Sequence, residues 1–164
     1  MEKYGFIGNK NFVQKIPTYG SGEKSGMISL EMLGFQNLTP CSQNNHLYIY
    51  TVKYPDRGDF IAIVGNEPSQ EIAYKLTDAI RKHVPNLPSE LLVVPGSGDI
   101  FQEIRLSDHS PFWDKGHRAI MVTDTAFFKN SHYDHPTDSI ETLDLDFITD
   151  VSIGVTEFLK QFLS

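Results

Sequence analysis

Side chains that can bind a cation or transfer a proton are densest between Ser107 and Asp146. The segment opens with Asp108 and His109. Four further donors fall within seven positions near its end, namely His132, Asp134, His135 and Asp138. Oxygen and imidazole donors at this spacing can bind a hard or borderline cation. The same residues are also compatible with a polar loop whose charges are solvated.

A single carboxylate interrupts the most informative apolar run in the first half of the chain, residues 27–35 (MISLEMLGF). The length of this run and its flanking glycines predict a strand. Glu31 lies in its middle, and an isolated buried charge is costly. Its carboxylate must therefore be paired, bound to a metal or directed into a polar cleft. The alternative is an edge strand in which Glu31 faces water.

Strands and helices alternate along the chain, and this order predicts an α/β fold with a partly parallel sheet. The other strand candidates are residues 59–65, 90–94 and 118–124. Helices are predicted over residues 9–16, 68–84 and 147–163. Strands that end in Asp, Thr or His place those side chains at the carboxyl edge of a sheet, where open α/β folds bind ligands.

Length and composition limit the classes of protein that the chain can represent. A length of 164 residues with 40% hydrophobic residues predicts one globular domain over residues 1–164. A net charge of −7 without a basic stripe argues against a nucleic-acid partner. No apolar run approaches the roughly 20 residues that span a bilayer. The N-terminus lacks the pattern of a signal peptide, which favours a cytoplasmic protein.

Several common catalytic motifs are missing from the sequence. There is no GxSxG elbow, no HExxH helix and no phosphate-binding P-loop. Cys41 is the one cysteine, and no activating base accompanies it. Carboxylates and histidines are therefore the candidates for chemistry.

Three separated stretches resemble one family in the right order: MISLEMLGF, SDHSPFWDKG and AIMVTDTAFFKNSHYDHPTDSIETLD. The family is that of the di-zinc aminopeptidases, which includes secreted bacterial aminopeptidases, glutamate carboxypeptidase and glutaminyl cyclase. The resemblance implies a three-layer α/β/α sandwich around a mixed, mostly parallel sheet, without the family's N-terminal part. It also implies two zinc ions bridged by a water at the carboxyl ends of the strands.

The resemblance implies metal-assisted hydrolysis of the first bond of a peptide with a free N-terminus. An acidic zinc ligand of the family falls on Glu31. The general base belongs to a Glu-Glu pair, and a gap-free match places it at Glu2. The pocket walls would include Met32 and Tyr133.

The departures from the family pattern concern its metal ligands. Lys3 stands where the second glutamate of the pair binds zinc, and a charged ammonium cannot do so. A histidine ligand falls on Asp134, which can bind zinc through oxygen; His132 or His135 could substitute if the loop shifts. The family's His-x-Asp segment and bridging aspartate lie upstream of the matched residues.

Two readings follow from these departures. In one, the chain is part of a zinc aminopeptidase that is active only when another chain supplies the missing half. In the other, it is a non-catalytic peptidase fold that acts as a binding or oligomerisation module, and this second reading is favoured for the chain alone. A sheet edge that the family's opening strands would cover is expected to be exposed, which favours a homo-oligomer or the missing N-terminal half as a partner.

Overall fold

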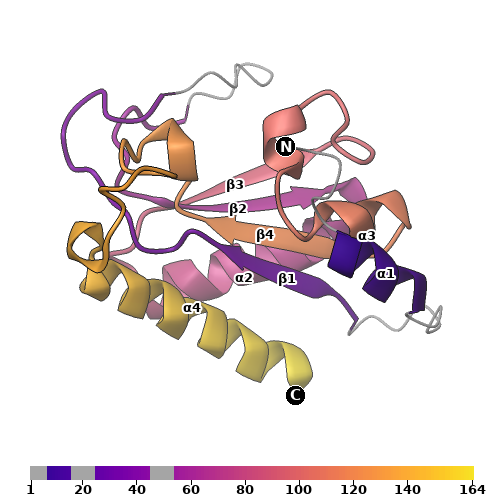
Figure 1. Ribbon diagram of the computed structural model, residues 1–164. Helices are drawn as coiled ribbons and strands as arrows, with labels where there is room; N and C mark the ends of the chain where they lie inside the picture. Colours follow the sequence, from indigo (N-terminus) through magenta and orange to yellow (C-terminus); the bar gives the residue numbers. More distant parts are fainter. Residues whose placement is uncertain (1–6, 16–24, 45–53) are drawn as a thin grey trace.

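The computed structural model describes residues 7–15, 25–44 and 54–164, and it places four strands in one sheet (Figure 1). The strands are β1 (Met27–Glu31), β2 (Ile61–Asn66), β3 (Ser89–Val94) and β4 (Ala119–Thr123). The helices are α1 (Ile7–Lys15), α2 (Gln70–His83), α3 (Ser110–Asp114) and α4 (Leu145–Leu163). Short 3-10 turns complete the order, namely η1 (Glu67–Ser69), η2 (Gln102–Arg105), η3 (Ala126–Phe128) and η4 (Ile140–Thr142).

The sheet is mixed and mostly parallel, with the strand order β1-β4-β2-β3. β1 pairs with β4 and β2 pairs with β3 in parallel, whereas β2 and β4 are antiparallel. The carboxyl ends of β1 and β4 therefore meet the amino ends of β2 and β3 at one edge of the sheet. The carboxyl ends of the two predicted apolar runs, which carry Glu31 and Asp124, lie at this edge.

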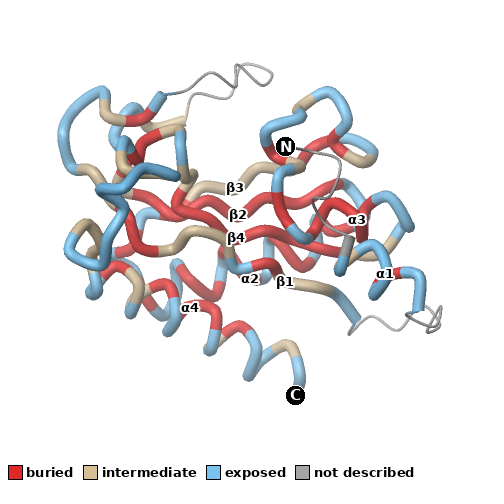
Figure 2. Tube along the Cα trace, viewed as in Figure 1, coloured by how far each residue is buried: buried red, intermediate tan, exposed pale blue. Residues whose placement is uncertain are grey.

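One face of the sheet is covered by α2 and α4, which lie side by side below it in Figure 1. Isoleucines 61 and 63 of β2 and Ile120 of β4 point into this layer and are fully buried. Figure 2 shows the buried stripe that runs along both helices where they face the sheet. The spacing of apolar residues along the two helices explains why they bury this face.

The opposite face is covered by α1 and α3 at only one end (Figure 1). Phe112 and Trp113 of α3 pack there against Ala119 and Met121 of β4, together with Val13 of α1. The indole nitrogen of Trp113 donates to the carbonyl of Ala119 at 2.7 Å. The rest of this face lies under loops. The predicted α/β sandwich is confirmed, because helices flank the sheet on both sides.

Two of the differences between predicted and observed element boundaries have a clear cause in the structure. The first strand ends at Glu31 instead of Phe35, because Met32 adopts a left-handed backbone with φ of 53°. The last helix begins at Leu145, because the side chain of Asp144 accepts a hydrogen bond from the amide of Phe147 at 2.9 Å. This N-cap satisfies a free amide of the first turn.

None of the helices that the structure describes is long and apolar enough to cross a bilayer.

The contact between α2 and α4 predicts a stability effect at Gly154. A methyl group added there would lie 2.6 Å from Cγ1 of Ile80, which is fully buried. Gly154→Val should therefore lower the free energy of unfolding by about 1–3 kcal/mol through overpacking. Urea denaturation followed by circular dichroism measures this, with Ser152→Ala on the exposed side of the same helix as the control. Equal losses in both variants would contradict the close packing.

Candidate functional site

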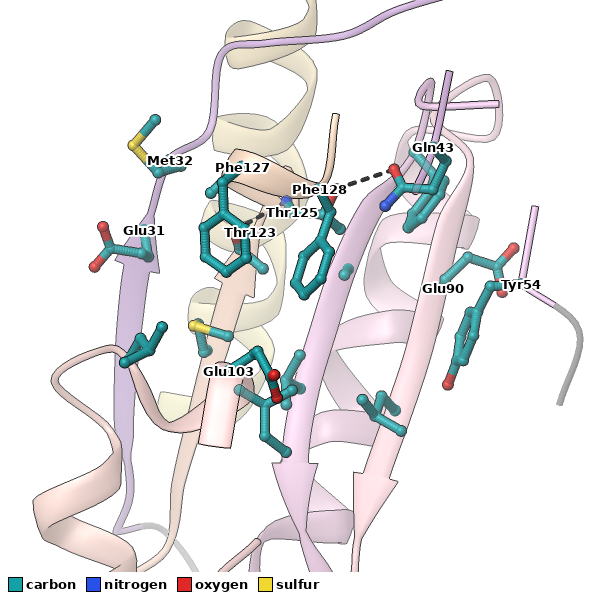
Figure 3. A pocket seen from close by; sticks show the side chains of 18 of the residues that line it. Glu31, Met32, Gln43, Tyr54, Glu90, Glu103, Thr123, Thr125, Phe127 and Phe128 are labelled. Carbon is teal, nitrogen blue, oxygen red and sulfur yellow. Dashed lines mark hydrogen bonds between the residues drawn. The ribbon is translucent and has the colours of Figure 1, made fainter. Parts of the chain in front are cut away.

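A groove opens on the partly covered face of the sheet, between η2 on one side and η3 on the other (Figure 3). Its floor is made by sheet residues, including Val64 of β2, Leu92 of β3 and Met121 of β4. Aromatic and aliphatic walls rise from the two sides, including Leu106, Phe127 and Phe128. Carboxylates, hydroxyls and amides also line it, namely Glu31, Gln43, Asn44, Tyr54, Glu90, Glu103, Thr123, Thr125 and Tyr133.

Glu31 lies at the end of edge strand β1, is half-buried and lines this groove, and Figure 3 shows its carboxylate directed away from Phe127 and Phe128. Its Oε2 accepts a hydrogen bond from the hydroxyl of Ser107 at 2.8 Å. The hydroxyl oxygen of Ser107 also lies 2.9 Å from that of Ser29, which is two residues before Glu31 on β1. The Glu31 side chain is thus held by a buried hydroxyl pair, so it is on an edge strand and also in a cleft.

Asp124 follows β4 directly and is almost fully buried beneath the groove. Its Oδ2 accepts from the amide of Phe35 at 2.7 Å, and its Oδ1 accepts from the amide of Ala126 at 2.8 Å. The amide of Asp124 itself donates to the carbonyl of Met32 at 2.6 Å. Burial raises the pKa of this carboxyl, and the two amide hydrogen bonds offset part of that effect.

Lys129 is the buried cation that faces Asp124. Its Nζ donates to the carbonyl of Phe60 at 3.2 Å and lies over the rings of Phe60 and Phe147, at 5.5 and 5.6 Å from their centroids. Burial lowers the pKa of Lys129 to about 8, although Asp124 and Asp59 both favour the charged form. This ammonium stabilises the fold around the groove and does not line the groove.

The structure brings part of the polar segment to the groove and leaves part of it outside. Tyr133 lines the groove beside Phe127, at 5.8 Å between ring centroids. Burial raises the pKa of Tyr133, and the negative charges of Asp134 and Glu31 add to this effect. Asp134 is exposed and has a left-handed φ of 56°, a conformation that aspartate tolerates better than most residues.

The histidines of the segment do not converge on Glu31. His132 points its Nδ1 to the hydroxyl of Thr137 at 3.0 Å, and its ring packs against Phe35. His135 is exposed. Met32, which was expected to form a pocket wall with Tyr133, lines the same groove. Glu2, the predicted general base, and Lys3 lie outside the residues that the structure describes.

The described donors do not fit a zinc site. Over residues 7–15, 25–44 and 54–164, no group of three His, Cys, Asp or Glu side chains is arranged to hold a metal ion. Glu31 and Asp134 supply two carboxylates and no nitrogen, whereas tight zinc sites use at least three protein ligands with histidine or cysteine among them.

His109 has a structural position that its sequence context did not indicate. The side chain is fully buried, and its ring meets that of Trp113 edge to face at 4.4 Å between centroids. Neither ring nitrogen makes a hydrogen bond of normal geometry. Burial lowers the pKa of His109 to about 4, and the nearby backbone of Ile104 offsets part of the shift. A neutral His109 therefore anchors the segment that presents Ser107 to Glu31.

Three groove residues, Glu90, Tyr54 and Glu103, were not identified from the sequence. Glu90 begins an apolar strand run and faces the groove, because it lies two positions before Leu92 on β3. Tyr54 lies beside it (Figure 3), and burial together with the charge of Glu90 raises the pKa of Tyr54 to about 12. The alternation of β3 was the signal for Glu90, whereas no local pattern indicated that Tyr54 and Glu103 would line the same groove.

Comparisons with known proteins show that this chain is similar to parts of longer proteins. It is 37% identical to the uncharacterized protein YfbL of Escherichia coli K12 over 134 residues, which are 81% of this chain and 40% of YfbL. Its fold matches crystal structures of LapA, an aminopeptidase of Legionella pneumophila, with TM-scores of 0.60 and 0.58. Identity there is 17% and 16%, and the matches cover 94% and 93% of this chain.

No protein-family model matches the chain. The chain spans about two fifths of the length of YfbL, and its matches cover only 36% and 35% of the LapA chains. The chain is thus a homologue of YfbL with the fold of about a third of an aminopeptidase. The resemblance predicted from the three sequence motifs is confirmed at the level of the fold.

The buried histidine predicts a specific loss of stability in acid. Its pKa is about 4 in the folded chain and 6.5 when unfolded, so the unfolded state binds its proton first as the pH falls. The free energy of unfolding should drop by about 3 kcal/mol from this group between pH 7 and pH 4. His109→Gln should flatten the pH dependence in this window, whereas His135→Gln, at an exposed site, should not. Parallel pH profiles for the wild type and His109→Gln would refute the assignment.

The buried carboxylate predicts a large stability effect. Asp124→Ala should lower the free energy of unfolding by about 3 kcal/mol, because two backbone amides lose their acceptor and the buried ammonium of Lys129 loses a negative charge that favours it. Asp138→Ala, which removes an exposed aspartate, serves as the matched control in guanidinium denaturation. A loss below about 1 kcal/mol at Asp124 would show that this network is not stabilising.

Proposed function

We propose that this chain is one part of an aminopeptidase-like hydrolase domain and that, by itself, it neither holds two zinc ions nor hydrolyses peptides. Within this proposal the groove is one wall of a peptide-binding cleft. Hydrolysis of N-terminal peptide bonds would require a complete domain.

The observation that carries this proposal is the donor set around Glu31. Glu31 is the carboxylate that the family pattern assigns to zinc, and it does lie in the groove with its orientation fixed by Ser107. The position of the family's histidine ligand holds Asp134, and no group of three His, Cys, Asp or Glu side chains among the described residues is arranged to hold a metal ion. One ligand position is thus supported by geometry, and the nitrogen donors that zinc requires are not supplied by the described residues.

What this chain can contribute to a peptide site is orientation and an apolar surface. The Glu31 carboxylate can accept hydrogen bonds from a peptide's N-terminal ammonium, because Ser107 occupies only one of its lone-pair directions. Met32, Phe127 and Tyr133 offer apolar surface beside it for the first side chain. Such a site binds and positions a peptide without supplying a nucleophile.

A second candidate is that the chain completes its site with residues from another chain. The length comparison supports it, because YfbL and LapA are each more than twice as long as the part that matches here. Edge strand β1 also supports it, since Leu30 is 54% exposed beside Glu31. An edge strand with an exposed apolar residue is suited to pair with a further strand.

Zinc content and hydrolysis test the proposal together. After incubation with excess zinc and desalting, the chain should retain substoichiometric zinc, and it should not hydrolyse leucine anilide. Asp134→His, which restores an imidazole at the family's ligand position, should raise zinc retention, whereas Asp138→His should do so less. Zinc is quantified by atomic absorption.

Retention of about two zinc ions per chain, with hydrolysis that a chelator abolishes, would overturn the proposal. It would mean that histidines or residues outside the described segments complete the site. Hydrolysis by a stable hetero-oligomer but not by the monomer would support the second candidate, and size-exclusion chromatography with light scattering separates the two species.

A further inference from the structure

Strand β1 forms one edge of the sheet and pairs through only one side of its backbone. Among the residues that the structure describes, it pairs with β4 and with no other strand. The amide of Met27 donates to the carbonyl of Arg118 at 3.0 Å, on the side of β4. Backbone groups alternate in direction along a strand, so the N–H and C=O groups of Ile28 and Leu30 face the open side. An open row of such groups is a template for a further strand.

The side chain of Leu30 lies on the face of the sheet that α2 and α4 cover, yet it remains exposed. Leu30 comes two residues after Ile28, which packs against the core between the sheet and these helices, and side chains two apart share a face. Its neighbour on β4, Val122, is fully buried in that core, whereas Leu30 is 54% exposed. The helix layer therefore ends before it covers the edge of the sheet.

Helix α4 has an uncharged face on the side that points past this edge. Gly154, Glu157 and Gln161 contact α2, which lies on the inner side of α4 (Figure 1). On the opposite side of the helix every residue is exposed and uncharged, and this outer face consists of Leu145, Ser152, Thr156, Leu159 and Leu163. It runs along all 19 residues of α4, or about 28 Å.

The outer face of α4 can be buried at little cost. Leu145, Leu159 and Leu163 are 62%, 38% and 69% exposed, so a partner would remove substantial apolar surface from water. The hydroxyl of Ser152 already donates to the carbonyl of Ile148 at 2.8 Å, so it needs no further acceptor. An exposed apolar face beside an open strand edge is the signature of an interaction surface.

We propose that a second copy of this chain pairs across this edge, through antiparallel contact of the two β1 strands and of the two α4 helices. A two-fold axis at Ser29 places Ile28 of each copy opposite Leu30 of the other, and each such pair exchanges both of its backbone hydrogen bonds. The two four-stranded sheets then form one continuous sheet. The outer faces of the two α4 helices meet beneath it, next to both Leu30 side chains.

The charges of α4 favour its own copy as the partner. The outer face carries no charge, so two copies of it do not repel each other. Asp146 and Asp150 lie in the N-terminal half of α4, and Lys160, which also pairs with Glu157 of its own helix, lies near the C-terminus. A two-fold axis makes the helices antiparallel, so the cation of one helix comes beside the carboxylates of the other. The inference concerns assembly and does not depend on the proposed hydrolase relationship.

Sedimentation equilibrium of the full chain tests the assembly. Between about 1 and 100 μM protein, with about 0.15 M salt to screen the net charge of −7, we expect a monomer–dimer equilibrium. Leu30→Lys and Leu159→Lys should each raise the dissociation constant roughly tenfold or more, because a two-fold interface contains each change twice. Ile100→Lys makes the same change at an exposed residue after β3, at the other edge of the sheet, and should leave the constant unchanged. Circular dichroism confirms that each variant is folded.

Amide hydrogen exchange, followed by NMR, tests the strand pairing itself. At a concentration where the wild type is dimeric, the amides of Ile28 and Leu30 should be protected, because the second copy accepts their hydrogen bonds. In Leu159→Lys at the same concentration these two amides should exchange freely. The amides of Ser29 and Glu31, which face β4, should stay protected in both proteins and provide the internal control.

The inference fails on any of three results. A chain that stays monomeric throughout this concentration range would show that the edge and the outer face of α4 do not bind a second copy. A dimer that Leu30→Lys and Leu159→Lys leave intact, or that Ile100→Lys weakens equally, would use another surface. A dimer in which the amides of Ile28 and Leu30 exchange as fast as in Leu159→Lys would exclude pairing of the two β1 strands.

Discussion

The buried carboxylate of Asp124 is the constraint on which the groove depends. Its oxygens accept hydrogen bonds from the amides of Phe35 and Ala126, and its own amide donates a hydrogen bond to the carbonyl of Met32. One residue thus joins the turn after β1 to the turn after β4. Lys129 supplies the opposite charge from the next loop. A buried carboxylate is tolerated only with such partners, and the partners in turn fix the loops that carry Met32, Phe127 and the aromatic wall.

The strand directions explain why Glu31 and Glu90 lie at the same end of the sheet. Because β2 runs antiparallel to β4, the beginning of β3 lies at the same edge of the sheet as the end of β1. Glu90 and Glu31, which are far apart in the sequence, thus stand on opposite sides of one surface. Ser107 holds one of these carboxylates, and the burial of His109 in turn fixes the position of Ser107.

Periodicity and motif order were sufficient to predict the strands, the two long helices and the aminopeptidase-like fold. The sequence also predicted that Glu31 lies on an edge strand or in a cleft, because a carboxylate inside an apolar run is costly to bury elsewhere. The early end of β1 depends on the left-handed backbone of Met32, and the burial of His109 depends on its contact with Trp113. Neither has a local sequence signal, because both arise from packing between segments that are distant in the chain. Glu2 lies outside the described residues, so its role stays a prediction.

The pairing of β1 with β4 also shapes how the chain folds. β2, α2 and β3 follow one another closely in the sequence, so their contacts are expected to form with little loss of chain entropy. Met27 must find Ala119 across most of the chain before β1 can join. Contacts of such long sequence separation form late and slowly. The strand that carries Glu31 is therefore expected to be the last to dock, and until it does the groove has no wall on that side.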